Sequence, residues 1–183
     1  NEVYGLTKGQ AGPTLGLGEK PKSLPRPNPQ GKVNPLLLAF ASGYTWIARG
    51  YAYDVKGLKE LIKEGIAHRG LAFLHVLQPC PTYNDLHTKE WFAPRLYRLE
   101  EEGYDPLVPP GLPPEALEAR MARFQQKALE WGERIPVGVF WKAELPTFEA
   151  RLKAYLPRYP EAYPARGPET PLDLEGLLQE FAL

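Results

Sequence analysis

Helical and strand patterns alternate through the middle of this chain, and this alternation constrains the fold more than any other feature. Asn34 is expected to cap a helix over residues 36–42, and a β-prone run over 45–49 follows. Asp54 is expected to cap a second helix that runs to about His68, with its apolar residues on one face. Residues 71–77 are almost all apolar, as in a strand buried in a parallel sheet. Helix, strand, helix, strand with short connections predicts an α/β sheet.

The second half of the chain continues the same pattern with one interruption. Residues 82–110 have no clean period and are expected to wrap the outside of the sheet. A long helix is then predicted from Pro114 to about Gly132, with an apolar stripe that includes Trp131. A buried strand over 137–141 follows, and Thr147 is expected to cap a helix through Leu152. We therefore expect an α/β fold with a mostly parallel sheet flanked by helices.

Two segments lie outside this pattern. Residues 9–32 are rich in Gly, Pro, Lys and Ser, which excludes a regular helix or a central strand. Loops of this length are usually lids, binding loops or connectors. At the other end, Leu174, Leu177, Leu178 and Phe181 recur at helical spacing. We expect one domain over residues 1–155 and a tail over 156–183 with a short amphipathic helix that could dock on a partner.

Charge and composition exclude several classes of function. The 22 basic and 22 acidic residues cancel, so nucleic acid and membrane surfaces are not expected partners. The longest apolar runs are far shorter than the roughly 20 residues of a membrane-spanning helix. The single cysteine, Cys80, excludes an internal disulfide, and no signal peptide is visible. A soluble, cytoplasmic protein is expected, and the opening at Asn1 reads as a start inside a fold.

The opening segment Asn1-Glu2-Val3-Tyr4-Gly5-Leu6-Thr7-Lys8-Gly9-Gln10 is the first candidate site. It offers an amide oxygen, free backbone groups around glycines, and one lysine. Oxygen ligands suit a hard divalent cation, and backbone N–H groups with Lys8 suit a diphosphate. The segment matches no general phosphate-binding motif, and an ordinary glycine-rich turn has the same composition.

The second candidate site is the loop Gln78-Pro79-Cys80-Pro81-Thr82-Tyr83-Asn84, directly after the apolar strand. Ligands bind at the carboxyl ends of strands in open α/β sheets. A cysteine followed by proline occurs where a loop turns around an iron–sulfur cluster, although a free cysteine is commonly a small buried apolar group. One cysteine cannot hold a cluster alone, so other thiolates would have to come from outside this chain.

The histidines and the common motifs add no further candidates. The spacing of His68, His75 and His87 fits no zinc pattern, and no catalytic role is assigned to them. His75 is interpreted as a hydrogen-bonded core residue. The chain contains no Gly-x-Ser-x-Gly, GxGxxG or Walker A sequence, so hydrolase and nucleotide-binding classes lack support.

Four segments together resemble the β subunits of 2-oxoacid:ferredoxin oxidoreductases. The opening 1–10 is similar to the end of their thiamine-diphosphate motif, and 34–50 is similar to the helix and strand that follow it. The segment 77–84 resembles their cluster-binding cysteine loop. Residues 135–149, with Ile-Pro-Val-Gly-Val-Phe-Trp-Lys, resemble a late strand. The order and spacing agree over most of the chain, except in the proline-rich loop and after about Tyr155.

The resemblance implies part of a thiamine-diphosphate-binding fold and a role for each matching residue. The Asn1 side chain and the Val3 main-chain oxygen would bind the Mg²⁺ that bridges thiamine diphosphate. Leu6 and Lys8 would lie near the reacting end of the cofactor and the substrate, in a cofactor-binding loop that includes Tyr4 and Gly5. Cys80 would be one ligand of a 4Fe–4S cluster. The loops that carry Asn1 and Cys80 are therefore expected to meet.

The resemblance also implies an activity and partners. The family carries out CoA-dependent oxidative decarboxylation of a 2-oxoacid and passes electrons to ferredoxin. The expected partners are the α subunit in a heterodimer, ferredoxin, coenzyme A, and an N-terminal part of the same subunit with a Gly-Asp-Gly motif and three more cluster cysteines. We expect this chain alone to bind neither cofactor tightly. Two alternatives remain: an inactive fragment or interaction module of the same fold, and a thiamine-dependent enzyme without a cluster, in which Cys80 is inert.

Overall fold

The computed structural model describes residues 1–159 and residue 179. They fall into two compact units, Asn1–Leu145 and a second that begins at Pro146. The second unit contains helix α5 (Phe148–Tyr155), which Thr147 caps as predicted. The amphipathic helix predicted around residues 174–181 lies outside the described residues, and the proposed division at 155/156 stays a prediction.

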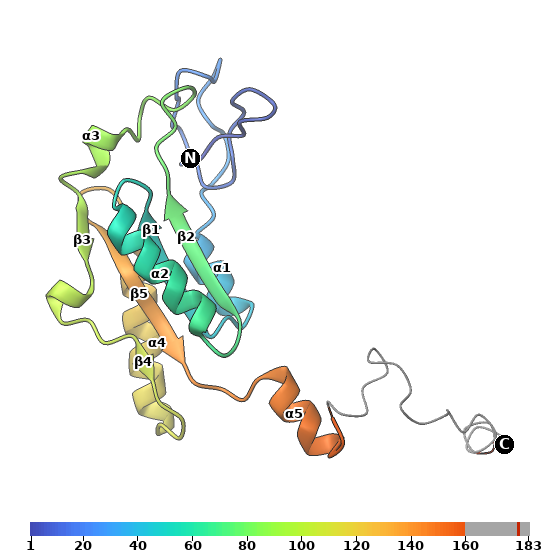
Figure 1. Cartoon of the computed structure of the whole chain (residues 1–183). Helices are drawn as coiled ribbons and strands as arrows, with labels where there is room; N and C mark the ends of the chain where they lie inside the picture. The colour runs from blue at the N-terminus through green and yellow to red at the C-terminus, as the bar shows by residue number, and fades with distance from the viewer. Residues whose placement is uncertain (160–178, 180–183) are drawn as a thin grey trace. The chain divides into compact units, whose positions relative to one another are not determined.

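A mixed sheet forms the centre of the first unit (Figure 1). Strand β1 (Trp46–Tyr51) pairs in parallel with β2 (Ala72–Leu77) and antiparallel with β5 (Ile135–Ala143). Two short strands, β3 (Leu96–Arg98) and β4 (Leu107–Val108), each pair in parallel with β5. All pairings are parallel except that of β1 with β5, so the predicted mostly parallel sheet is confirmed.

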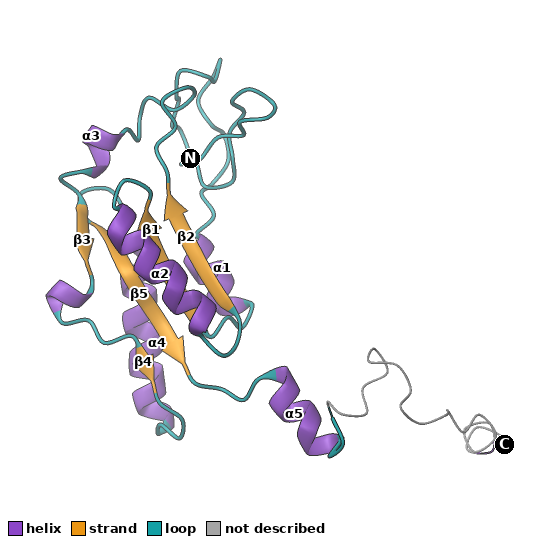
Figure 2. Ribbon diagram, in the orientation of Figure 1, coloured by secondary structure: helices purple, strands orange, loops and turns teal. Residues whose placement is uncertain are grey.

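Helices cover both faces of this sheet (Figure 2). Helix α2 (Val55–Ala67) packs on β1 and β2 on one face. Helices α1 (Pro35–Ala41) and α4 (Pro114–Leu129) lie on the other face and contact each other. The predicted caps are present: the side-chain oxygens of Asn34 and Asp54 accept hydrogen bonds from the first turns of α1 and α2. Local capping chemistry therefore positions both helices.

The main core lies between the helix pair α1–α4 and strands β1 and β5. Phe40 of α1 stacks on Phe124 of α4 at 4.7 Å between ring centroids, and meets Trp141 of β5 edge-on at 4.9 Å. Phe124 and Phe140 are completely buried. Burial of each such side chain stabilises the fold by about 1.5–3 kcal/mol. This core therefore stabilises the edge of the sheet from which the candidate loops extend.

The segment 82–110 departs from its prediction. It contains the short helix α3 (Lys89–Phe92) and the 3₁₀ turn η1 (Glu100–Glu102), but β3 and β4 also join the sheet. The expectation that this segment only wraps the outside was therefore wrong. Strands of three and two residues are too short to show a period in the sequence.

The predicted helix that would include Trp131 is also shorter than expected. Helix α4 ends at Leu129, and Trp131 packs beyond it against a second apolar cluster with Phe92 and Tyr51. Within the described residues, no helix has the combined length and hydrophobicity that crossing a bilayer requires.

Candidate functional site

The two predicted loops meet beyond the carboxyl end of β2. Figure 1 shows the N-terminal segment beside the arrowhead of this strand, where the cysteine loop also begins. The side-chain Nδ2 of Asn84, in the cysteine loop, donates a hydrogen bond of 3.2 Å to the main-chain oxygen of Asn1. The expected meeting of the loops is therefore observed, although residues 1 and 84 lie far apart in the sequence.

Backbone hydrogen bonds close the opening segment into a rigid loop. Tyr4 N donates to Gln10 O at 2.9 Å, and Gly9 N donates to Tyr4 O at 2.7 Å. Val3 forms a β-bridge with Ala11 at the base of the loop. Gly9 has φ of 101°, and a Cβ there would lie 2.5 Å from the Ser23 Cβ, so this turn requires glycine. The opening loop is therefore held in place by its own backbone hydrogen bonds and by its close approach to the proline-rich segment.

The predicted site residues of this loop occupy two different environments. Asn1 is exposed but borders a cavity, and its Oδ1 accepts a hydrogen bond of 3.2 Å from the N–H of Val3, which is buried. Tyr4 and Leu6 are 53% and 98% exposed, and Gly5 and Lys8 are also exposed, at the far end of the loop. The structure therefore separates Asn1 and Val3, at the base, from Tyr4, Gly5, Leu6 and Lys8, at the tip.

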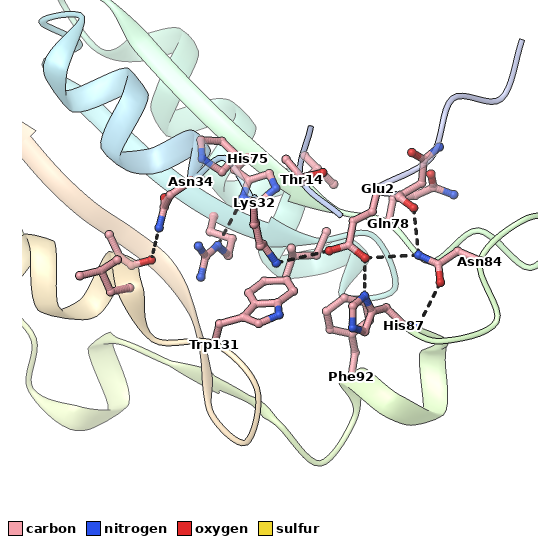
Figure 3. A pocket seen from close by; sticks show the side chains of 17 residues that line it. Glu2, Thr14, Lys32, Asn34, His75, Gln78, Asn84, His87, Phe92 and Trp131 are labelled. Atoms are coloured by element: carbon pink, nitrogen blue, oxygen red, sulfur yellow. Dashed lines mark hydrogen bonds and ion pairs between the residues drawn. The ribbon is translucent and has the colours of Figure 1, made fainter. Parts of the chain in front are cut away.

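A cavity of about 250 Å³ lies beside Asn1 (Figure 3). It is bounded by the opening loop, the end of the proline-rich segment, the start of α1, β1, the end of β2 and the turn after α4. Its polar lining includes Thr14, Lys32, Arg49, His75, Gln78 and Asn84. The proline-rich segment is therefore an ordered wall of this cavity.

Glu2 lies at the centre of an ion-pair network on the cavity wall. Its Oε2 contacts His87 Nδ1, and its Oε1 lies 3.4 Å from Lys32 Nζ. The other ring nitrogen of His87 lies 3.5 Å from Glu19 Oε1. Burial raises the pKa of Glu2, but the hydrogen bonds and charges of His87 and Lys32 outweigh it, so the pKa lies below its usual value. The Glu2 carboxylate is thus held charged.

Arg49 adds a positive charge to the same cavity. Its guanidinium is 2% exposed and donates to His75 Nδ1 and to Pro136 O, both at 3.3 Å. Burial lowers its pKa to about 10, which leaves it charged near neutral pH. Burial and the charge of Arg49 lower the pKa of His75 to about 3, so the ring stays neutral and can accept this hydrogen bond. The hydrogen bond predicted for His75 is present, but the residue is half-buried and lines the cavity instead of lying in the core.

No carboxylate among residues 1–159 pairs with the Arg49 guanidinium, whose other contacts are with the Phe140 and Trp131 rings. A buried charge without a counterion is costly unless an anion approaches it. The Lys32 ammonium, 3.2 Å from the centroid of the Trp131 ring, is neutralised by Glu2. The cavity therefore suits a negatively charged group.

Cys80 is the only cysteine of the chain and lies half-buried in the turn after β2. The main-chain N of Asn84 donates to Cys80 O at 2.9 Å, and Lys22 Nζ donates to Pro81 O at 2.8 Å. The Cys80 turn is therefore closed by its own backbone and tied to the proline-rich segment.

Three sets of donors among residues 1–159 are candidates for a metal or cluster site. Glu2, Glu19 and His87 each offer one ligand atom, and these atoms lie within 4.8 Å of one another. The two carboxylates approach different nitrogens of one ring and Lys32 lies beside them, so this group is better described as an ion-pair network. The Asn1 amide oxygen and the Val3 carbonyl are oxygen donors of the kind Mg²⁺ takes, and the Cys80 sulfur suits an iron–sulfur cluster. Asn1 and Val3 would therefore supply part of a Mg²⁺ site, and Cys80 would supply one ligand of a cluster.

His87, Asn84 and Arg49 were missed by the sequence analysis as members of the site. His87 matched no zinc spacing, and Asn84 was noted only as the end of the cysteine loop. Their roles depend on Glu2, more than 80 positions away, so no local motif could reveal them. Arg49 had one detectable signal, since it is a charged residue in the β-prone run 45–49.

Comparisons with known proteins extend this description over nearly the whole chain. The family model "Thiamine pyrophosphate enzyme, C-terminal TPP binding domain" matches residues 1–76. The family model for the C-terminal part of the pyruvate ferredoxin oxidoreductase beta subunit matches residues 80–156. The boundary between the two matches falls directly before Cys80, so each candidate loop belongs to a different model.

Two curated relatives are similar over most of this chain. The 2-oxoacid:ferredoxin oxidoreductase subunit beta of Sulfolobus sp is 58% identical over 91% of this chain and 54% of its own length. The protein of the same description from Saccharolobus solfataricus is 51% identical over 98% of this chain and 60% of its own length. The chain thus spans little more than half the length of these relatives.

A solved structure is similar over the full chain. It is the 2-oxoglutarate:ferredoxin oxidoreductase from Magnetococcus marinus with 2-oxoglutarate, coenzyme A and succinyl-CoA bound. The TM-score is 0.72 at 26% identity, covering 100% of this chain and 56% of that one. The expected thiamine-diphosphate type of fold and the resemblance inferred from four sequence segments are both confirmed.

Proposed function

We propose, from its similarity to 2-oxoacid:ferredoxin oxidoreductase β subunits, that this chain is part of such a subunit and contributes to the CoA-dependent oxidative decarboxylation of a 2-oxoacid. In this proposal the chain supplies part of the site for Mg²⁺ and thiamine diphosphate and one ligand of a 4Fe–4S cluster. The observation that carries it is the contact between the loop of Asn1 and the loop of Cys80. The remaining ligands, ferredoxin, coenzyme A and the α subunit complete the proposed enzyme.

Each candidate loop offers the donor chemistry that its proposed cofactor needs. Asn1 Oδ1 and the Val3 carbonyl would hold Mg²⁺, because hard cations prefer oxygen ligands. Cys80 would hold the cluster through its thiolate. When bound, thiamine diphosphate supplies the electron sink for decarboxylation and the cluster carries single electrons. The protein's contribution is to hold the two groups at a fixed separation.

The tip of the opening loop is proposed to face the substrate. Lys8 is exposed there and could attract the substrate carboxylate through a charge-assisted contact. Leu6 presents an almost completely exposed apolar side chain. We propose that it is covered by cofactor, substrate or the α subunit in the assembled enzyme. The positive charge of Arg49, which pairs with no carboxylate among residues 1–159, supports the approach of an anionic group from the cavity side.

The decisive experiment is Cys80→Ser in the assembled complex. We expect ferredoxin reduction to fall to background, because the oxygen of serine is a poor replacement for an iron-ligating thiolate, while thiamine-diphosphate binding is retained. Asn1→Ala should have the opposite profile, with weakened cofactor binding and an intact cluster spectrum. Unchanged electron transfer in Cys80→Ser would favour the alternative of a thiamine-dependent enzyme without a cluster.

A further inference from the structure

The side chain of Asn84 joins the cysteine loop to the opening loop (Figure 3). Its main-chain N–H closes the turn that begins at Cys80, with an N–O distance of 2.9 Å. Its side-chain Nδ2 donates to Asn1 O at 3.2 Å and to Glu2 Oε2 at 3.3 Å. One residue is thus bonded both to the turn of the candidate cluster ligand and to the backbone of the candidate Mg²⁺ ligand.

The side chain of Asn84 uses its donors and its acceptor together. In addition to the two donated bonds, its Oδ1 accepts from Leu86 N at 3.0 Å and from His87 N at 3.3 Å. The residue is 2% exposed, so water cannot easily replace these partners. An aspartate has the same shape but no donor, and its second oxygen would face the Asn1 carbonyl and the Glu2 carboxylate. The position therefore requires an amide.

Glu2 connects Asn84 to other residues that line the cavity. The carboxylate that receives Asn84 Nδ2 also contacts His87 Nδ1 and lies beside Lys32. His87 follows Asn84 by three residues, and Lys32 comes from the end of the proline-rich segment. A displacement of the Asn84 amide would disturb Asn1 directly and Glu2 at the same time.

We propose that Asn84 is a positioning residue that fixes the loop of Asn1 and Val3 against the loop of Cys80, and so sets the relation between the thiamine-diphosphate site and the iron–sulfur cluster. The inference rests on the proposed function. The inference goes beyond that function because it assigns a role to a residue that is a ligand neither of Mg²⁺ nor of the cluster. Outer residues that orient metal ligands typically change metal affinity roughly 10–100-fold when they are replaced.

The test uses the assembled enzyme with the substitution Asn84→Asp. Two properties are measured without turnover: the affinity for thiamine diphosphate with Mg²⁺, and the electron paramagnetic resonance spectrum of the reduced cluster. We expect affinity to weaken by roughly 10-fold or more and the cluster spectrum to shift in the same variant. A coupled change at both groups is what a bridge between the loops predicts.

Asn28→Asp is the matched control. Asn28 is also a buried asparagine, 3% exposed, and its Nδ2 donates to the carbonyls of Leu15, Gly16 and Gln30. It fixes the proline-rich loop but bonds to neither candidate loop residue. We expect Asn28→Asp to lower the unfolding temperature, while cofactor affinity stays within about twofold and the cluster spectrum is unchanged, since separate sites act independently.

The outcomes separate this inference from the function on which it depends. A wild-type complex without a cluster, or without cofactor binding, would reject the proposed function itself. A normal wild type with both properties unchanged in Asn84→Asp, or changed equally in Asn28→Asp, would overturn only the role of Asn84. If Asn84→Asp does not fold, Glu2→Gln replaces it, because this variant leaves the Cys80 turn intact. We expect smaller changes in the same two properties, and no change in either would overturn the inference.

Discussion

His75 and Arg49 form a hydrogen-bonded pair in which His75 is neutral. The neutral state of His75 makes the stability of the fold depend on pH. The ring of His75 accepts from a buried guanidinium, and burial together with that charge lowers its pKa to about 3 from the ordinary 6.5. Between these two values the unfolded chain binds a proton that the folded chain does not. The free energy of unfolding must therefore fall as the pH falls below about 6.5.

We predict that His75→Asn removes this pH dependence. The asparagine Oδ1 can still accept from Arg49 Nε, but it does not titrate. At about 1.4 kcal/mol per pH unit, the wild-type chain should lose about 2 kcal/mol more than the variant between pH 7 and pH 5. Urea unfolding at both pH values measures the difference. Equal losses would show that His75 is protonated in the folded state.

Arg49 allows a second test at the residue scale. Arg49→Lys keeps a buried charge but cannot serve both His75 Nδ1 and Pro136 O, whereas Arg49→Met removes the charge. We predict that the lysine variant loses about 3–5 kcal/mol in the free energy of unfolding and that the methionine variant loses less. The measurement is chemical denaturation of both variants. A lysine variant as stable as the wild type would contradict the assigned hydrogen bonds.

At the scale of elements, Asn34 performs two functions at the start of α1. Its Oδ1 accepts from Leu36 N at 3.0 Å and from Leu37 N at 3.2 Å. Its Nδ2 donates to Ala128 O in the last turn of α4 at 2.7 Å. The cap of one helix is therefore also a tie to the end of another, and both helices border the cavity.

We predict that Asn34→Ala costs about 1–3 kcal/mol, the loss of a cap plus a buried hydrogen bond. Asn34→Ser should recover part of this loss, since its hydroxyl can cap α1 but cannot reach Ala128 as an amide does. Thermal unfolding followed by circular dichroism compares the three proteins. If serine and alanine are equally destabilising, the cap contributes nothing and the tie to α4 accounts for the whole effect.

At the scale of the whole molecule, the proposed sites are incomplete within this chain. It contains one cysteine, whereas a cluster usually needs four thiolates, and the opening loop offers two of the roughly six oxygen ligands of Mg²⁺. We predict that the 183-residue chain, reconstituted alone with iron and sulfide, does not hold a stoichiometric cluster. Iron analysis with visible absorbance is the measurement. A stable cluster at one per chain would overturn the assignment of Cys80 as a single ligand.

Much of the architecture could be predicted from the sequence because its causes are local. Asn34 and Asp54 are followed at once by the helices they cap, and the apolar run before Cys80 is itself the strand β2. The two candidate loops were also recognisable, since a cysteine after a buried strand and an asparagine in a glycine-rich segment are visible in the linear sequence. Periodicity and capping act within a few residues, which is the range that a sequence pattern records.

The tertiary structure alone decided how these pieces meet. The short strands β3 and β4, the antiparallel pairing of β5 with β1, and the bonds of Asn84 and His87 to Glu2 join residues far apart in the chain. Such contacts leave no period and no spacing in the sequence, because they depend on how the core between the sheet and the α1–α4 pair closes. The packing of this core, and no local sequence signal, therefore brings the cysteine loop to the opening loop.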